Sequence, residues 1–147
     1  RCVEQLGEIA EATESFTGLG FTKQLKETND KQSLAVTAVQ LAETLGAKGI
    51  VVITRRGLMA DYVTNCHPQK TRIFAFTNDS QTRRRLILNR NLTPYRTAFS
   101  SDPEKTLQTS FDVLKERAGL QSNDKVVVIS DVLAGTGIEA IQIRHLP

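Results

Sequence analysis

The sequence predicts an α/β fold in which a mostly parallel sheet carries helices on both faces. Short apolar runs rich in branched residues, such as GIVVIT at residues 49–54 and KVVVIS at residues 125–130, are typical of strands that are covered on both sides. Segments with apolar residues at helical spacing separate these runs, and the alternation of strand and helix favours parallel pairing. We therefore expect a three-layer α/β/α sandwich.

Five strands are expected. They cover residues 49–54, 72–77, 93–99, 125–130 and 138–144. Only the glycine-rich turn at residues 134–137 separates the last two strands, and this turn is too short for a crossover helix. The last strand is therefore expected to run antiparallel to the fourth. The usual order of such sheets also places the first and the fourth strands side by side.

Four helices are expected to connect these strands. They cover residues 29–45, 57–65, 79–88 and 102–118. The first is expected to bury a stripe made of Leu34, Ala38, Leu41 and Leu45. The fourth is the best defined by the sequence, because Asp102 is a typical N-cap and a proline follows it.

The chain divides into two parts. Residues 1–28 are expected to form an amphipathic connecting helix (residues 3–16) with a glutamate stripe, followed by a glycine-punctuated linker. Residues 29–147 are expected to form the α/β domain. Within the first part, the acidic stripe is interpreted as a face in contact with solvent.

The composition argues against a membrane-spanning protein and a disulfide-stabilised one. The 147 residues are 39% hydrophobic and 24% charged, as in ordinary globular proteins, and no apolar run approaches the roughly 20 residues of a membrane span. The first residues do not follow the basic-then-apolar pattern of a secretory signal. Cys2 and Cys66 form neither a disulfide framework nor a metal spacing, so we expect two reduced thiols in the cytoplasm.

No catalytic or metal-binding constellation is expected. Neither His67 nor His145 has a serine, cysteine or carboxylate partner at a recognisable spacing, and the neighbours Cys66 and His67 point apart. Asp131 follows a central strand, but a role in forming the turn is favoured over that of a catalytic acid. An enzyme acting on its own is therefore the least favoured interpretation.

A ligand site is expected at the carboxyl ends of the first and fourth strands, where the strand order of such sheets reverses. A helix amino terminus, two guanidinium groups, hydroxyls and glycine backbone together favour a phosphate or a carboxylate. The residues concerned are Thr54, Arg55, Arg56, Gly57, Ser130, Gly135, Thr136 and Gly137. The alternative is that the arginines are surface residues and that the glycines serve turn geometry, because neither loop matches a known nucleotide-binding motif.

The basic run Arg83–Arg85 has three interpretations. It is a solvated helix face, an interface with another subunit or domain, or a nucleic-acid contact. The last is disfavoured, because few aromatic residues are interleaved with the basic ones and the net charge of +3 is mild.

From about Asn29 onward the chain resembles the C-terminal domain of pyruvate kinase, and plastid-type members in particular. SLAVTAVQLAETLGAKGIVVITRRG, HPQKTRIFAFTNDSQTRRRLILNRNLTPY, the helix that ends at Arg117, KVVVIS and GTGIEAIQIRHLP carry the resemblance in collinear order. The resemblance implies a sheet of order 3-2-1-4-5, an allosteric effector site and part of a tetramer interface. It also implies a separate catalytic barrel that binds phosphoenolpyruvate, ADP or ATP, magnesium and potassium, with no cofactor in this domain.

The effector loop of that family carries over in part. Thr54 and Gly57 match its pattern, whereas Arg56 and Met59 stand where small hydroxyl residues are usual and Leu58 follows the glycine. The resemblance further implies an effector contact from Arg117 and a flexible last loop at residues 135–137. Loss of the hydroxyls argues against fructose bisphosphate, and leaves the arginines either to receive a sugar monophosphate or to brace the loop.

The favoured function is therefore a regulatory and assembly domain of a pyruvate kinase, which is not catalytic by itself. The alternative is a stand-alone phosphate-ligand sensor without a kinase partner. Expected partners are a phosphorylated sugar or nucleotide, the catalytic barrel and a second copy of the chain, with residues 30–45 and the last strand as interface candidates. A plant-type parent would place the protein in the plastid stroma instead of the cytoplasm.

Overall fold

The computed structural model describes residues 30–130 and 140–147. The predicted helix and linker of residues 1–28 lie outside this part of the chain. The elements of the described part are α2 (Asp30–Leu45), β1 (Gly49–Ile53), α3 (Leu58–Asn65), β2 (Arg72–Thr77), α4 (Ser80–Leu86), β3 (Leu92–Arg96), α5 (Pro103–Arg117), β4 (Lys125–Ser130) and β5 (Ala140–His145).

The five strands form one mixed sheet of order β3-β2-β1-β4-β5. All neighbouring pairs are parallel except β4 and β5, which are antiparallel. The predicted order and the antiparallel last strand are thus confirmed. β1 is central and every residue in it is buried, as expected for a continuous apolar run covered on both faces.

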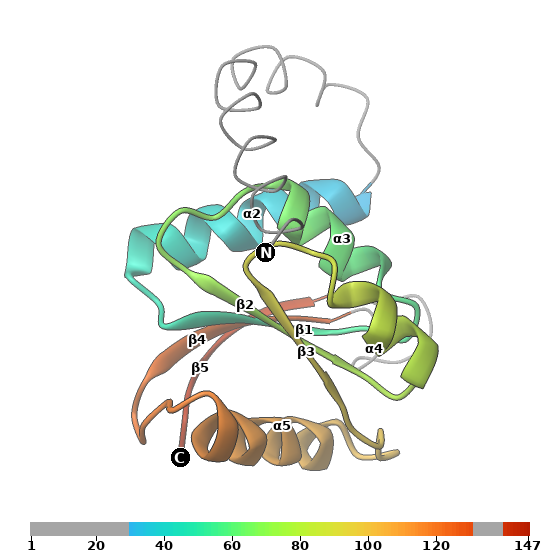
Figure 1. The fold of residues 1–147 in the computed structure, drawn as a ribbon. Coiled ribbons are helices and arrows are strands. Elements are labelled where there is room, and N and C mark those ends of the chain that lie inside the picture. Colours follow the sequence, from blue (N-terminus) through green and yellow to red (C-terminus); the bar gives the residue numbers. More distant parts are fainter. Residues whose placement is uncertain (1–29, 131–139) are drawn as a thin grey trace. The chain divides into compact units, whose positions relative to one another are not determined.

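Helices cover both faces of the sheet, which confirms the predicted three-layer sandwich (Figure 1). Because successive side chains of a strand point to opposite faces, β1 contributes to two cores. Ile50 and Val52 pack with α2, α3 and Leu86 of α4, whereas Val51 and Ile53 pack with α5.

The face that α2 buries differs from the predicted one. Its fully buried residues are Ala35, Ala38 and Ala42, with Val39 close behind, so only Ala38 of the predicted stripe is correct. Leu34 and Leu41 are only partly buried, and Leu45 is 36% exposed. Small alanine side chains allow the helix backbone to lie close to the sheet, and the leucines are left at the flanks of the contact.

Several boundaries also differ from the predicted ones. β3 ends at Arg96 rather than at residue 99, because Arg96 pairs with Thr77, the last residue of β2. α3 begins at Leu58, since its N-cap Gly57 has a left-handed backbone. The helix α4 ends at Leu86, two residues early.

The last strand is also displaced. β5 runs from Ala140, which pairs with Ser130, to His145, and residues 138–139 of the predicted strand lie outside the described part. The start of α5 agrees with the prediction, because the Asp102 carboxylate accepts a hydrogen bond from the Glu104 amide at 3.1 Å.

Candidate functional site

The carboxyl ends of β1 and β4 lie side by side. Ile53 pairs with Ser130, so the loop that follows β1 begins next to the last residue of β4. Thr54 and Ser130 are both buried, with exposed fractions of 0% and 2%. The structure therefore brings together these two predicted site residues at the edge of the sheet where ligands of such folds bind.

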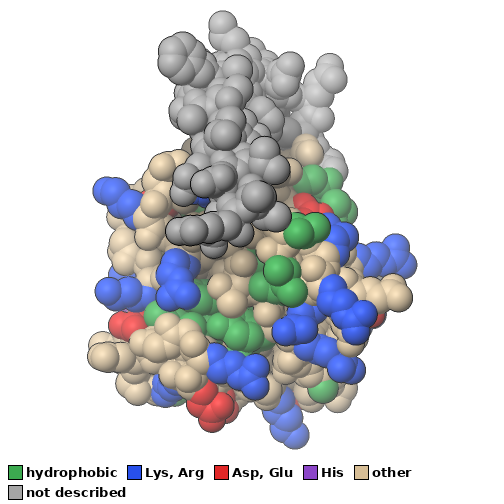
Figure 2. Space-filling view, viewed as in Figure 1, with side chains coloured by type: hydrophobic (Ala, Val, Ile, Leu, Met, Phe, Trp, Pro, Cys, Tyr) green, Lys and Arg blue, Asp and Glu red, His purple; other side chains and the backbone are tan. Residues whose placement is uncertain are grey.

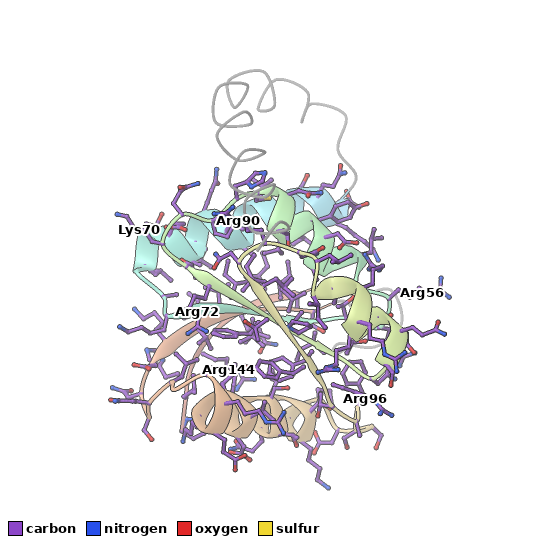
Figure 3. All side chains as sticks on the ribbon, viewed as in Figure 1. Arg56, Lys70, Arg72, Arg90, Arg96 and Arg144 are labelled. Carbon is purple, nitrogen blue, oxygen red and sulfur yellow. The ribbon has the colours of Figure 1, made fainter. Side chains whose placement is uncertain are left out.

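The loop after β1 folds into a tight turn that starts α3. The backbone amide of Gly57 donates a hydrogen bond of 3.1 Å to the Thr54 hydroxyl oxygen. Gly57 has a φ of 84°, a left-handed conformation that favours glycine. Arg55 and Arg56 lie on the exposed side of this turn, and Figure 3 shows the Arg56 side chain extending outward beside α4.

The amino terminus of α3 has no side-chain cap, in contrast to the two helices that follow it. Asp79 caps α4 and Asp102 caps α5, but Gly57 offers α3 no side-chain acceptor. The first amides of a helix have no intrahelical acceptor, and the helix dipole makes this end positive. An uncapped helix start preceded by two exposed arginines is therefore suited to an anion.

The carbonyl groups of Arg55 and Arg56 in this loop each accept a hydrogen bond from a side chain. The Thr77 hydroxyl, at the end of β2, donates a 3.0 Å hydrogen bond to the carbonyl oxygen of Arg55. The Arg85 guanidinium, from α4, donates a 2.9 Å hydrogen bond to the carbonyl oxygen of Arg56. The loop is thus fixed by one side chain from β2 and one from α4.

Arg85 also forms the main ion pair near the loop. Its Nη1 lies 3.1 Å and 2.9 Å from the two carboxylate oxygens of Asp61, in the first turn of α3. Asn89 donates a further 2.8 Å hydrogen bond to the same carboxylate. All three arginines of the predicted basic run are exposed, but Arg85 makes these contacts with its own domain.

The sequence assigns no site role to Thr77 or Asp61, and it marks Arg85 only as part of the basic run Arg83–Arg85. A role for Thr77 can be inferred, because Thr54 follows β1, Thr77 ends the neighbouring strand β2, and Ile53 pairs with Phe76. Arg85 has no such indication, since its partners lie 24 and 29 residues away along the chain.

Arg117 does not belong to this site, contrary to the sequence-based expectation. α5 leaves the carboxyl end of β3 and returns to the amino end of β4. Its last residue therefore lies at the amino ends of the strands, whereas Thr54 lies at their carboxyl ends. In agreement, Lys115 contacts the carbonyl of Pro147, which follows the β5 end that pairs with Lys125. The predicted residues Gly135, Thr136 and Gly137 lie outside the described part.

Two residues that depart from the family's loop pattern, Met59 and Leu58, have different environments. Met59 is fully buried and belongs to the core under α2, so it does not face a ligand. Leu58, the first residue of α3, is 43% exposed beside the loop. Basic side chains predominate over acidic ones on the molecular face in Figure 2, where Lys70, Arg72, Arg90 and Arg96 are placed by Figure 3. This excess does not mark the loop after β1, because Lys70, Arg72 and Arg90 lie at the amino ends of β2 and β3.

Two titratable groups have shifted pKa values. Burial raises the pKa of the Cys66 thiol to about 11, and this thiol donates a hydrogen bond to the Tyr62 carbonyl, so it is not an activated nucleophile at neutral pH. Hydrogen bonds from the amide and the hydroxyl of Thr82 lower the pKa of Asp79, which caps α4.

Residues 30–130 and 140–147 lack two further features. This part of the chain holds no group of three or more histidine, cysteine or acidic residues arranged to bind a metal ion. Its helices are too short or too polar to cross a membrane.

Comparisons with known proteins agree on one family. Residues 32–142 match the family model described as "Pyruvate kinase, alpha/beta domain". Among curated proteins, the chain is 35% identical over 116 residues to the chloroplastic pyruvate kinase isozyme A of Ricinus communis, covering 79% of this chain and 19% of that protein. Over 130 residues it is 28% identical to pyruvate kinase 2 of Synechocystis, covering 88% of this chain and 22% of the relative.

The fold is also found in solved structures. The structure of Cryptosporidium parvum pyruvate kinase in complex with ADP superimposes with a TM-score of 0.75 at 22% identity, covering 83% of this chain and 25% of that one. At this identity the match concerns the fold. The chain spans about a fifth of the length of the curated relatives that it matches.

Proposed function

This chain belongs to the pyruvate kinase family through its α/β domain, and from that premise we propose that it is the regulatory and assembly part of a pyruvate kinase. In the proposed parent enzyme, phosphoryl transfer from phosphoenolpyruvate to ADP takes place in a separate catalytic barrel. The part formed by this chain binds a phosphorylated effector. The names of the plant relatives, which are chloroplastic, support a location in the plastid rather than in the cytoplasm.

The observation that carries the effector proposal is the uncapped start of α3 beside Arg55 and Arg56. A phosphate group placed there would receive the free amides of the first helical turn and one or both guanidinium groups. Ser130 lies at the adjacent strand end. Arg56 occupies a place where a small hydroxyl would line the site, and Leu58 follows the glycine, so a ligand with one phosphate fits this loop better than a bisphosphate.

A thermal-shift screen of the purified chain tests this proposal. The panel comprises fructose 1,6-bisphosphate, glucose 6-phosphate, ribose 5-phosphate, AMP, ATP and inorganic phosphate. A ligand at 100 times its dissociation constant stabilises a protein by about 2.7 kcal/mol, which raises the melting temperature of a domain of this size by several degrees. We expect a shift with a sugar monophosphate that is lost in Arg56→Ala.

The matched control is Arg83→Ala, which removes the same charge from an exposed position on α4. It should keep the ligand-induced shift. If no compound of the panel shifts the melting temperature of the unmodified chain, the effector proposal is wrong for this chain. If Arg56→Ala and Arg83→Ala reduce the shift equally, the ligand responds to net charge and not to the loop.

We also propose that the chain contacts a second copy of itself through β5. This strand lies at the edge of the sheet, so one side of its backbone has no strand partner in the described part. On one face of the strand, Ile141 packs against the core under α2, whereas Ile143 is 48% exposed. An apolar residue on an open strand edge supports pairing with another chain.

A further inference from the structure

Arg85 joins three parts of the molecule that surround the loop after β1. It belongs to α4, its Nη1 binds both oxygens of Asp61 on α3, and its Nη2 binds the carbonyl of Arg56 in the loop at 2.9 Å. The guanidinium also covers Gly57, because a Cβ built on this glycine would lie 2.4 Å from Nη2. A single planar fork of donors therefore satisfies a carboxylate and a carbonyl at once.

These contacts fix the orientation of the peptide planes in the loop. In a planar trans peptide the C=O and N–H groups point in opposite directions. Because the Arg55 carbonyl points toward Thr77, the amide of Arg56 points away from β2. Because the Arg56 carbonyl points toward Arg85, the amide of Gly57 points away from α4, where it meets the Thr54 hydroxyl.

Arg85 also compensates a charge that opposes anion binding. Asp61 lies in the first turn of α3, and its carboxylate would repel an anion at the helix start. The ion pair with Arg85, in which Nη1 contacts both carboxylate oxygens, offsets this charge, and the carboxylate receives a further hydrogen bond from Asn89. Loss of Arg85 would thus release the loop carbonyl and leave the Asp61 carboxylate without its cation.

We propose that Arg85 is the positioning residue of the phosphate loop, holding the Arg56 carbonyl away from the ligand and neutralising Asp61 without touching the ligand itself. This inference rests on the proposed effector function. It predicts that position 85 requires an arginine, because lysine has one ammonium group and cannot present a planar fork to both acceptors. It also distinguishes Arg85 from Arg84, which is likewise exposed and lies in the same turn but makes no side-chain hydrogen bond to the described residues.

The experiment compares Arg85→Ala, Arg85→Lys, Asp61→Asn and the control Arg84→Ala. Affinities for glucose 6-phosphate and inorganic phosphate are measured by calorimetry, and the amide resonances of Arg56 and Gly57 are recorded by NMR without ligand. We expect Arg85→Ala and Arg85→Lys each to weaken binding by about tenfold or more, as for the loss of a charge-assisted hydrogen bond. Both should move the two resonances, whereas Arg84→Ala should leave them in place.

Each other outcome has a defined meaning. If the unmodified chain binds neither probe, the effector proposal fails, and the positioning role is decided by the resonances alone. If it binds and Arg85→Lys matches the unmodified chain in affinity and resonances, charge suffices and the positioning role is wrong. Should Arg85→Ala not fold, Arg85→Lys and Asp61→Asn carry the test. If the Arg56 and Gly57 resonances are unchanged in both Arg85→Lys and Asp61→Asn, the proposal is overturned.

Discussion

At the scale of single residues, Gly57 has both a left-handed backbone and close side-chain neighbours, whereas Gly46 has only the left-handed backbone. Both have a left-handed backbone, with φ of 84° and 63°. A Cβ on Gly46 would meet no atom within 4 Å, but a Cβ on Gly57 would displace Arg85 and press on Thr82 and Leu86. Comparison of the two glycines therefore separates the cost of the conformation from the cost of the lost loop contacts.

We expect Gly46→Ala to lower the free energy of unfolding by about 1 kcal/mol, the cost of a left-handed alanine. Gly57→Ala should lower it by about 2–3 kcal/mol, since the guanidinium must also leave the Arg56 carbonyl. Urea denaturation of both variants gives the two values. Equal losses would mean that the contacts of Arg85 add nothing to the stability of the loop.

At the scale of elements, α2 demonstrates that the largest apolar side chains need not face the core. Its contact with the sheet is made by alanines, with Ala38 at 0% exposure. Ala38→Leu should therefore overpack the interface and lower the free energy of unfolding by about 1–3 kcal/mol. Gln40→Leu introduces the same side chain at an exposed position of the same helix, and should change stability by less than about 0.5 kcal/mol.

Urea denaturation of these two variants provides the measurement. Ala38 belongs to both the predicted and the observed buried face of α2, so Ala38→Leu does not distinguish them. Leu45→Ala does. A core leucine costs about 2–5 kcal/mol when truncated to alanine, whereas the 36% exposed Leu45 should cost much less. A large loss in Leu45→Ala would contradict the observed orientation of α2.

The sequence predicted those elements whose information is local. Buried strands such as KVVVIS are recognisable because both faces are apolar, and Asp102 with Pro103 marks the start of α5 within two residues. The loop at Thr54 was placed correctly because strand order determines which ends meet. The strands and the start of α5 need no knowledge of contacts between distant segments, whereas the loop was placed from the usual strand order of such folds.

The failures arise where distant segments decide the outcome. The stripe of α2 depends on how closely the helix approaches the sheet, which periodicity does not reveal. The placement of Arg117 followed a resemblance and ignored the direction of α5, which returns to the amino ends of the strands. The contacts of Arg85 depend on α3 and α4 lying side by side, and in the sequence it is one of three equivalent arginines.

At the scale of the whole molecule, the sheet has two unlike edges. β3 carries Pro94 and ends in Arg96, and a proline and a charged residue are both features that discourage pairing with another strand. β5 has no proline and exposes Ile143 on the face that packs against α2. Self-association is therefore expected at the β5 edge and not at the β3 edge.

Sedimentation velocity over a range of concentrations measures this association. We expect the chain to form dimers or larger assemblies at micromolar concentrations, and Ile143→Lys to weaken them at least tenfold, because a charge would be buried at the contact. Ile87→Lys is the matched control, since Ile87 is even more exposed, at 55%, and follows α4 on the β3 side of the sheet. A strict monomer at high micromolar concentration would refute assembly through this domain. If both lysines weaken the association equally, the added charge and not its position causes the effect. The contact would then not be at β5.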